Sequence, residues 1–214
     1  MEHPFRDRRE AGQRLAQTLS PYRGRDDVIV LALPRGGIPV GYEVAHALGA
    51  PLEVFVVRKL GLPWHEELAM GAIASGGARV LNDDVLRAHG VTQSQLDEVT
   101  AREQIELDRR ERQYRDGRVF PDLRGKTVIL VDDGLATGAS MRAAVAALRH
   151  DGPSKVVVAV PVAPRETCDA FRDLADEIIC SATPEPFYGV GQWYENFEQT
   201  TDDEVNDLLR RGAA

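Results

Sequence analysis

The stretch Val128-Ile-Leu-Val-Asp-Asp-Gly-Leu-Ala-Thr-Gly-Ala-Ser140 carries the strongest signals for fold and function in this 214-residue chain. It begins with a short apolar run rich in β-branched residues, which predicts a buried strand of the kind found in parallel sheets. Two carboxylates and a loop with two glycines follow, before a helix-forming run. A strand that leads through such a loop into a helix gathers free backbone N–H groups and the positive helix end at one point. That arrangement predicts an anion site.

The polar side chains of this stretch indicate which anion would bind. Thr137 and Ser140 supply hydroxyl donors that suit phosphate oxygens. Asp132 and Asp133 would repel a phosphate, so we expect them to accept hydrogen bonds from sugar hydroxyls or to hold a hydrated Mg²⁺. A phosphate cradle beside an acidic pair predicts a phosphosugar site. The alternative is an ordinary strand-to-helix turn with two surface acids, but these features rarely coincide at the end of one strand.

The stretch resembles the phosphoribosyl-pyrophosphate (PRPP) loop of the type I phosphoribosyltransferases, through Val131, the two acids and the Thr-Gly-x-Ser clasp. The resemblance implies that Asp132 and Asp133 meet the ribose hydroxyls and Mg²⁺, which reaches them directly or through water. Gly134 departs from the family pattern, in which a small aliphatic residue usually follows the acids, and we expect a looser backbone there. The residues that would bind the 5-phosphate are Ala136, Thr137, Gly138, Ala139 and Ser140.

A second loop of the same kind lies upstream. An apolar strand over 28–33 leads into the turn Pro34-Arg-Gly-Gly37, and a helix is predicted over 38–49. The turn places a permanent guanidinium beside two residues that can adopt unusual backbone angles. Alone, such a turn is more often structural. Upstream of the acidic loop it resembles the pyrophosphate loop of the same family, which implies that Arg35 and Gly36 bind the leaving pyrophosphate.

A third segment, Leu52-Glu-Val-Phe-Val-Val-Arg-Lys-Leu-Gly-Leu-Pro63, predicts a buried strand over 52–57 that ends in Arg58 and Lys59. It is similar to adenine-type phosphoribosyltransferases, which implies that both residues touch the pyrophosphate or the 5-phosphate. A mobile lid over about 60–80 would follow. The alternative is that two basic residues at a strand end simply meet solvent. On the whole resemblance, the residues expected to be catalytic are Asp132, Asp133, Arg35 and Lys59.

Strands alternate with helices along the chain, which predicts an α/β fold with a doubly wound, mostly parallel sheet flanked by helices. We expect one domain over 1–214, with a core over about 28–180. All three ligand loops would lie at carboxyl ends of strands, where such sheets bind ligands. The remaining predicted elements are helices near 5–19, 138–150, 164–174 and from 202, and strands near 70–74, 78–81, 127–131, 155–161 and 177–180.

A charged helical insertion is predicted over about 83–118. Its spacings Glu106–Arg110 and Asp108–Arg112 fit ion pairs one helical turn apart. A dimer arm or partner surface and a charged helix lying on the sheet are both open interpretations.

The segment over about 183–200 is rich in aromatic residues and too interrupted by proline and glycine to form a helix. Its position after the last core strand resembles the hood that binds the acceptor in type I phosphoribosyltransferases. Packing alone would explain at least half of its aromatics. The candidate acceptor contacts are Phe187, Tyr188, Trp193 and Tyr194.

Composition limits the classes of function. The net charge of −8 argues against a general nucleic-acid or membrane-surface binder, and no apolar run is long enough to span a bilayer. The N-terminus lacks a signal-peptide pattern. Cys168 and Cys180 have no metal or redox spacing, so we expect reduced thiols in a cytoplasmic protein. The histidines form no metal spacing, and only His65, on the predicted lid, is a candidate for proton transfer.

The resemblance implies a phosphoribosyltransferase that transfers the 5-phosphoribosyl group from PRPP, with Mg²⁺, to a nitrogen acceptor such as a nucleobase. The resemblance also implies a homodimer. One alternative is a PRPP-binding regulator of the same fold that lacks transferase activity. Another is an Mg²⁺-dependent phosphotransfer module of the receiver type, in which the acidic pair would instead lie in the first strand.

Overall fold

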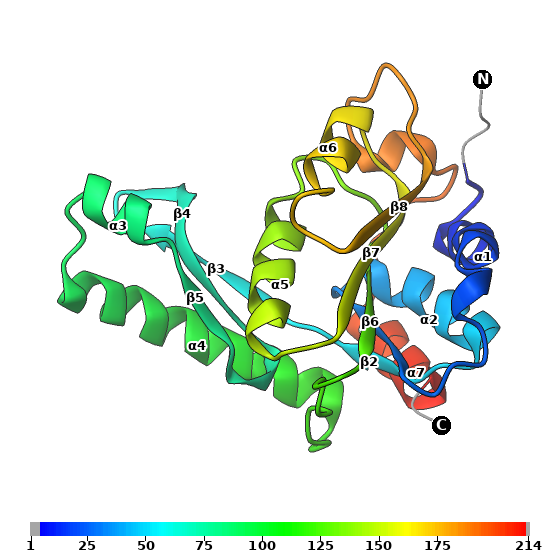
Figure 1. The fold of residues 1–214 in the computed structure, drawn as a ribbon, viewed down its shortest axis with the longest axis horizontal. Coiled ribbons are helices and arrows are strands. Elements are labelled where there is room, and N and C mark those ends of the chain that lie inside the picture. The colour runs from blue at the N-terminus through cyan, green and yellow to red at the C-terminus, as the bar shows by residue number, and fades with distance from the viewer. Residues whose placement is uncertain (1–4, 213–214) are drawn as a thin grey trace.

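The computed structural model describes residues 5–212 and contains two β-sheets (Figure 1). The larger sheet has five strands in the order β2-β1-β6-β7-β8, and every neighbouring pair is parallel. This confirms the predicted α/β fold with a parallel sheet. The strands are β1 (Val28–Ala32), β2 (Leu52–Val54), β6 (Thr127–Val131), β7 (Lys155–Val162) and β8 (Glu177–Ala182).

Helices cover both faces of the parallel sheet. Alternate residues of a strand point to opposite faces, and in β1 Val30 belongs to one buried cluster while Leu31 belongs to the other. The first cluster contains apolar residues of α1 (Arg8–Thr18), α2 (Gly37–Leu48) and α7 (Asp202–Gly212). The second contains those of α5 (Ala139–His150) and α6 (Arg165–Ala170). The continuous apolar strands seen in the sequence are therefore buried on both sides.

The second sheet is antiparallel and projects from the core together with two helices (Figure 1). We call residues 57–115 the arm. The expectation of one strand over 52–57 followed by a lid loop is wrong, because β2 ends at Val54 and the chain then enters the second sheet. The arm comprises β3 (Val57–Leu62), β4 (His65–Ala74), β5 (Arg79–Leu81), α3 (Asp83–Ala88) and α4 (Gln93–Arg115).

The predicted helical insertion is two helices, and the longer, α4, packs on the second sheet. Thr92 and Gln95 form a capping box at its start. Leu96 and Leu107 are buried, whereas Ile105 is exposed. The ion pair between Glu106 and Arg110 forms at 2.8 Å. The second expected pair does not form, because Arg112 donates to the backbone carbonyl of Asp108 instead.

Arg115 joins the arm to the parallel sheet. Its side chain is 6% exposed and donates to the carbonyl oxygen of Val54 at 2.9 Å. Burial lowers the pKa of this guanidinium. The carboxylates of Glu111 and Glu53, at 3.4 and 3.9 Å, act in the opposite direction and raise it. The guanidinium also lies over the ring of Phe120 at 4.4 Å. The hydrogen bond from Arg115 to Val54 fixes the C-terminal end of α4 against β2.

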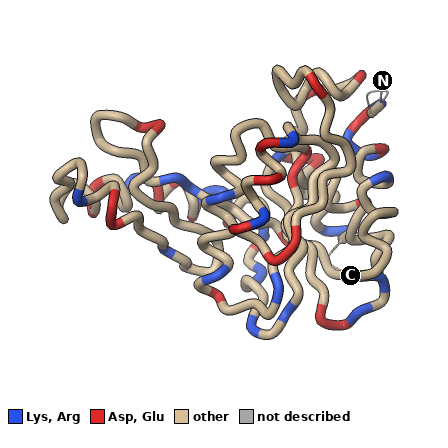
Figure 2. The backbone as a smooth tube through the Cα atoms, turned by 45° about the horizontal axis from the view of Figure 1, so that its top comes forward, with Lys and Arg blue, Asp and Glu red and all other residues tan. Residues whose placement is uncertain are grey.

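Charges of both signs are interspersed over the core and the arm in the view of Figure 2. Among residues 5–212, no helix is both long and apolar enough to cross a membrane.

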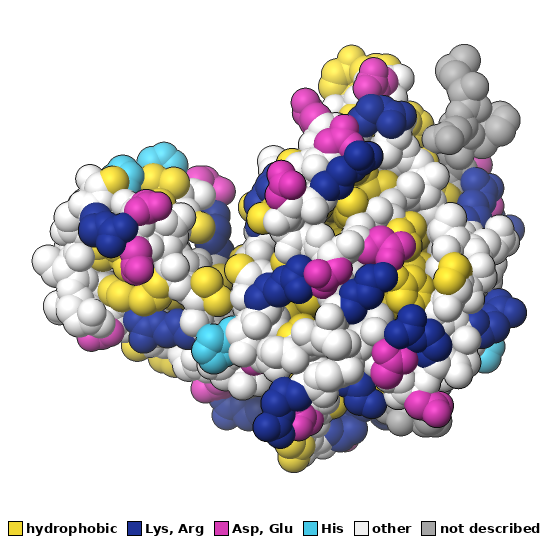
Figure 3. Space-filling model, in the orientation of Figure 1, with side chains coloured by type: hydrophobic (Ala, Val, Ile, Leu, Met, Phe, Trp, Pro, Cys, Tyr) yellow, Lys and Arg dark blue, Asp and Glu magenta, His cyan; other side chains and the backbone are white. Residues whose placement is uncertain are grey.

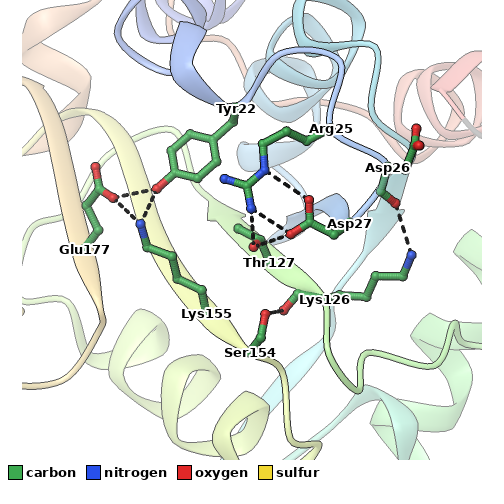
Figure 4. A network of polar contacts seen from close by, with 9 residues as sticks. All are labelled: Tyr22, Arg25, Asp26, Asp27, Lys126, Thr127, Ser154, Lys155 and Glu177. Atoms are coloured by element: carbon green, nitrogen blue, oxygen red, sulfur yellow. Dashed lines mark hydrogen bonds and ion pairs between the residues drawn. The ribbon is translucent and has the colours of Figure 1, made fainter.

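A polar network closes the amino end of the parallel sheet (Figure 4). Arg25 donates to both carboxylate oxygens of Asp27, at 3.0 and 2.7 Å, and the Thr127 hydroxyl donates to the same carboxylate at 2.9 Å. Next to it, Lys155 donates to Tyr22 and Glu177, each at 2.7 Å. The first set of bonds links the start of β1 to the start of β6, and the second links the starts of β7 and β8, at the edge opposite the ligand loops.

This network predicts an acid-dependent loss of stability. The hydrogen bonds from Arg25 and then Thr127 lower the pKa of Asp27 to about 2 from its usual 3.8. A lowered native pKa stabilises the fold above the unfolded value and ceases to do so as the pH falls toward 2. We expect Asp27→Asn to lower the urea midpoint at pH 7, and the difference from the unsubstituted protein to shrink between pH 4 and about 2. Asp26→Asn is the control, because it removes a neighbouring charge and keeps the backbone carbonyl through which Asp26 contacts Lys126. Equal effects of both variants would contradict the assignment.

The two cysteines form a disulfide, so the expectation of reduced thiols is wrong. Cys168 lies on α6 and Cys180 on β8. Because the chain returns from that helix to the sheet, the Cα atoms of the two cysteines lie 6.8 Å apart. Their sequence spacing held no sign of this, because the bond depends on how α6 packs. The pairing also removes the argument from free thiols for a cytoplasmic location.

The disulfide predicts that reduction destabilises the protein. Closing a loop of this length stabilises a native state by about 3 kcal/mol through the unfolded chain. We expect dithiothreitol to lower the thermal midpoint of the unsubstituted protein and to leave a Cys168→Ser, Cys180→Ser variant unchanged. Titration of thiols in denaturant without reductant should find none. Two free thiols would contradict the disulfide.

Candidate active site

The loops after β1 and β6 meet where the strand order reverses. From β1 the chain proceeds to β2 on one side, whereas β6 is followed by β7 on the other. The crevice at such a switch point is where open parallel sheets bind ligands. Val28 pairs with Thr127 and Ala32 with Val131, so the two strands end level with each other. The turn with Arg35 and the acidic pair therefore lie side by side.

The two loops approach so closely that glycine is required. Leu33 donates its backbone N–H to the carbonyl of Val131 at 3.0 Å. A Cβ atom on Gly37 would lie 2.9 Å from that carbonyl oxygen and 3.0 Å from the Cα of Asp132. A Cβ on Gly36 would overlap the carboxylate of Asp133. Gly36 and Gly37 therefore allow this turn to pack closely against Asp132 and Asp133.

Arg35 stands at the edge of this crevice, and the peptide bond that joins it to Pro34 is cis. Its guanidinium lies 3.8 Å from the carboxylate of Asp202, which in turn accepts the Tyr114 hydroxyl at 2.7 Å. Burial and this hydrogen bond raise the pKa of Tyr114 to about 12. The arm and α7 therefore both contribute to the surroundings of Arg35.

The acidic pair lies in the crevice with little access to solvent. Asp132 accepts the backbone N–H of Asp133 at 2.8 Å, and the side chain of Asp133 is 15% exposed. Burial, followed by repulsion from Asp133, raises the pKa of Asp132 well above its usual range. Burial also raises the pKa of Asp133, which Arg8 opposes. Two carboxylates short of positive charge favour a cation or hydroxyl donors beside them.

A residue that the sequence analysis missed supplies positive charge to this pair. Arg8, at the start of α1, donates its Nε to Asp133 Oδ2 at 2.8 Å. The two residues are far apart in the sequence, and nothing in the local pattern around Arg8 distinguishes it from Arg6 or Arg9.

The predicted phosphate clasp opens α5. Gly138 has a φ of +72° and precedes the first helical turn, which glycine allows at little cost. Thr137 and Ser140 are exposed, so their hydroxyls are accessible to a ligand. α6 supports the loop from behind, because Thr167 donates to the carbonyl of Ala136 at 2.9 Å and Phe171 lies against Gly138.

Gly134, the departure from the family pattern, makes room for the hood. A Cβ atom there would lie 2.6 Å from Val190 and 3.1 Å from Val162. The residue is buried, so the expected loosening of the backbone gives way to close packing.

Arg58 and Lys59 are separated by the pleat of β3. Arg58 donates twice to Glu103 of α4, at 2.9 and 2.6 Å. Lys59 instead contacts Glu67 at 3.1 Å. Because neighbouring residues of a strand point to opposite faces, one ligand does not reach both side chains along the same face.

Lys59 lines a cleft of about 690 Å³ between the arm and α5, the hollow seen in Figure 3. Ala139 of the clasp lies on the opposite wall with Arg142. The cleft therefore brings Lys59 and the start of α5 to one space, whereas Asp132, Asp133 and Arg35 lie outside its lining. His65 begins β4 and is exposed.

The hood over 183–200 packs its aromatic side chains unevenly. Tyr194 is 6% exposed and donates its hydroxyl to the carbonyl of Asp133. Phe187 and Trp193 stack on each other at 6.4 Å, while Tyr188 is 87% exposed. Phe5 joins the hood through backbone hydrogen bonds to residues 193 and 195. Tyr194 therefore has a structural role, because its hydroxyl supports the backbone of the loop at Asp133.

The donor set at the acidic pair is compatible with Mg²⁺. Residues 5–212 hold no group of three or more His, Cys, Asp or Glu side chains placed for a metal. Mg²⁺, however, is commonly bound through one or two carboxylates together with substrate phosphates and water. Asp132 and Asp133 provide two carboxylates of that kind.

Comparison with known proteins identifies the family of this chain. A family model described as "Phosphoribosyl transferase domain" matches residues 8–191. The crystal structure of the protein TT1426 from Thermus thermophilus has a TM-score of 0.89 and 43% identity, covering 99% of this chain and 100% of that one. The chain therefore belongs to the phosphoribosyl transferase domain family.

Two proteins from Mycobacterium tuberculosis strains CDC 1551 / Oshkosh and ATCC 25618 / H37Rv, each named "Putative phosphoribosyl transferase", are 50% identical to this chain over 207 residues. The match includes 97% of this chain and 46% of each relative. The chain thus spans less than half the length of these curated relatives.

The close contact of the two loops predicts that Gly37→Ala destabilises the protein. Alanine gains up to about 1 kcal/mol in helix propensity. Here its Cβ would press on the backbone of β6, and overpacking of this kind costs about 1–3 kcal/mol. We expect a lower urea midpoint. Gly189→Ala is the matched control, since a Cβ there would meet nothing within 4 Å. A Gly37→Ala variant more stable than the unsubstituted protein would contradict the packing argument.

Proposed function

We propose that this protein binds PRPP with Mg²⁺ and transfers its 5-phosphoribosyl group to a nitrogen acceptor with release of pyrophosphate. The observation that carries the proposal is the convergence of three features at the switch point. These are the buried acidic pair, the open clasp at the start of α5 and the turn with Arg35. Family membership and the position of the crevice support the same activity.

In this proposal the 5-phosphate binds at residues 136–140. The N–H groups of the first turn of α5 are free of intrahelical partners and carry the positive end of the helix dipole. The exposed hydroxyls of Thr137 and Ser140 add donors at the same point. The rigid support from α6 holds the clasp in shape before the ligand arrives, which limits the entropy lost on binding.

The ribose binds over the acidic pair. Its hydroxyls donate to Asp132 and Asp133, which supplies partners to two carboxylates whose pKa burial raises. Mg²⁺, held by the same carboxylates directly or through water, would neutralise charge on the pyrophosphate as it leaves.

The pyrophosphate binds at Arg35 and Gly36, with Lys59 reaching it from the arm. Arg35 is 37% exposed at its side chain and is paired with Asp202 only loosely, so it is free to turn toward an anion. Lys59 pairs with a carboxylate that is 88% exposed, a contact of little strength. Arg58 is held by Glu103, and we assign it to fixing α4 on β3 until a ligand draws it away.

The reaction requires a nitrogen nucleophile to displace pyrophosphate at the anomeric carbon. Positive charge then develops on the ribose, near the two carboxylates, and negative charge develops on the leaving group, near Arg35 and Lys59. Fixed charges placed where new charge appears lower the barrier without a covalent intermediate. Closure of residues 60–80, the expected lid, over the crevice would exclude water from the reacting centre.

The acceptor is expected to meet the hood, and a nucleobase is our first candidate. Of the four candidate contacts, Tyr188 and the stacked pair Phe187 and Trp193 have surface accessible to an acceptor, whereas Tyr194 is buried. The proposal also includes the homodimer that the family resemblance implies and the cytoplasmic location expected from the sequence.

The second candidate is a regulator that binds PRPP without transferring it. Sequestration of Arg58 by Glu103 favours this alternative, because it removes one expected pyrophosphate contact. Both candidates share the PRPP site and differ in turnover.

The test is to measure PRPP binding by calorimetry with Mg²⁺, and pyrophosphate release across a panel of purine and pyrimidine bases. We expect release with at least one base and a loss of about a hundredfold or more in Asp133→Asn. Asp26→Asn, the same change at a distant surface position, should behave as the unsubstituted protein. Binding without release for any base would favour the regulator. No binding of PRPP would contradict both candidates.

A further inference from the structure

Arg8 is held by two acceptors at once. Its Nε donates to Asp133 Oδ2 at 2.8 Å, and its Nη1 donates to the carbonyl oxygen of Glu198 at 2.7 Å. Only 12% of its side chain is exposed. A charge-assisted bond in so enclosed a place is stronger than a surface ion pair and holds the carboxylate in one orientation.

The guanidinium of Arg8 also stacks on the hood. Its central carbon lies 4.0 Å from the centre of the Phe197 ring and 5.9 Å from that of Tyr194. Tyr194 donates its hydroxyl to the backbone of Asp133, and the two rings pack together at 5.0 Å. The hood therefore reaches Asp133 by two routes, through the tyrosine hydroxyl and through the stacked arginine.

The start of α1 directs Arg8 toward this position. Asp7 caps the helix by accepting the backbone N–H of Glu10 at 2.8 Å, so Arg8 is the first helical residue. A Cβ on Gly36 would lie 3.3 Å from Arg8 Nε. The side chain thus sits where the acidic pair, the Arg35 turn and the hood meet. Its neighbour Arg9 is 73% exposed and pairs with Glu43 elsewhere.

We propose that Arg8 is a positioning residue for PRPP, which acts by holding Asp133 Oδ2 so that the other carboxylate oxygen faces the ribose, and by coupling that orientation to residues 197–198 of the hood. The inference rests on the proposed function. A planar guanidinium is needed because its rigid set of donors reaches two separate acceptors while its face stacks on a ring, which a lysine ammonium cannot do. Arg8 does not touch PRPP in this arrangement.

The test compares Arg8→Ala and Arg8→Lys with the control Arg9→Ala. Calorimetry with Mg²⁺ and PRPP reports on the whole site, and calorimetry with inorganic phosphate reports on the phosphate-binding groups without the ribose. We expect Arg8→Ala to weaken PRPP binding roughly tenfold or more, and to leave phosphate binding within about twofold. The PRPP affinity of Arg8→Lys should lie between those of Arg8→Ala and the unsubstituted protein, since lysine keeps the charge beside Asp133 but loses the hydrogen bond to Glu198. Arg9→Ala should match the unsubstituted protein.

Three results would overturn the inference. PRPP affinity unchanged in Arg8→Ala would show that Asp133 needs no such support. An equal loss of PRPP and phosphate binding would indicate a purely structural role. If Arg8→Ala does not fold, Arg8→Lys decides the matter, and unchanged PRPP affinity in that variant would count against the coupling. Failure of the unsubstituted protein to bind PRPP would instead overturn the proposed function, and this inference with it.

Discussion

The parallel pairing of β1 with β6 is the constraint on which the site depends. These strands are far apart in the sequence, and their level register brings the two ligand loops to the same edge of the sheet. A shift of one residue would turn every side chain of a strand to the other face and would separate the loops. The polar network at the opposite edge, from Arg25 to Glu177, closes the sheet where no ligand is expected.

The second constraint is the cost of holding two carboxylates in a crevice. The close approach of the Arg35 turn, which Gly36 and Gly37 permit, limits the access of water to Asp132 and Asp133. The protein offsets part of this cost with one guanidinium from α1 and with the backbone N–H of Asp133. The remaining imbalance prepares the pair for hydroxyl donors and a cation, so the electrostatics of the crevice already favour the proposed ligand.

The arm was the least predictable part of the fold. The run from Leu52 to Val57, apolar except for Glu53, predicts one strand, because nothing in its composition marks the point where the chain leaves one sheet for another. Arg58 and Lys59 look like one basic patch in the sequence, yet the pleat of β3 sends them to different partners. The disulfide between Cys168 and Cys180 and the packing of Val190 over Gly134 likewise depend on contacts that no local pattern encodes.

Local sequence patterns were enough to establish the parallel α/β core and the position of both ligand loops in it. Buried strands, glycine turns and helix starts have local physical causes. Because three segments that each begin with a predicted strand follow one another along the chain, few topologies had to be considered. The side chains that complete the site emerged only from the folded chain. Arg8, Tyr194 and Glu103 act on residues of loops and strands far from them along the chain. Such partners are chosen by the packing of helices and hood around the sheet, and the period of a sequence pattern carries no information about them.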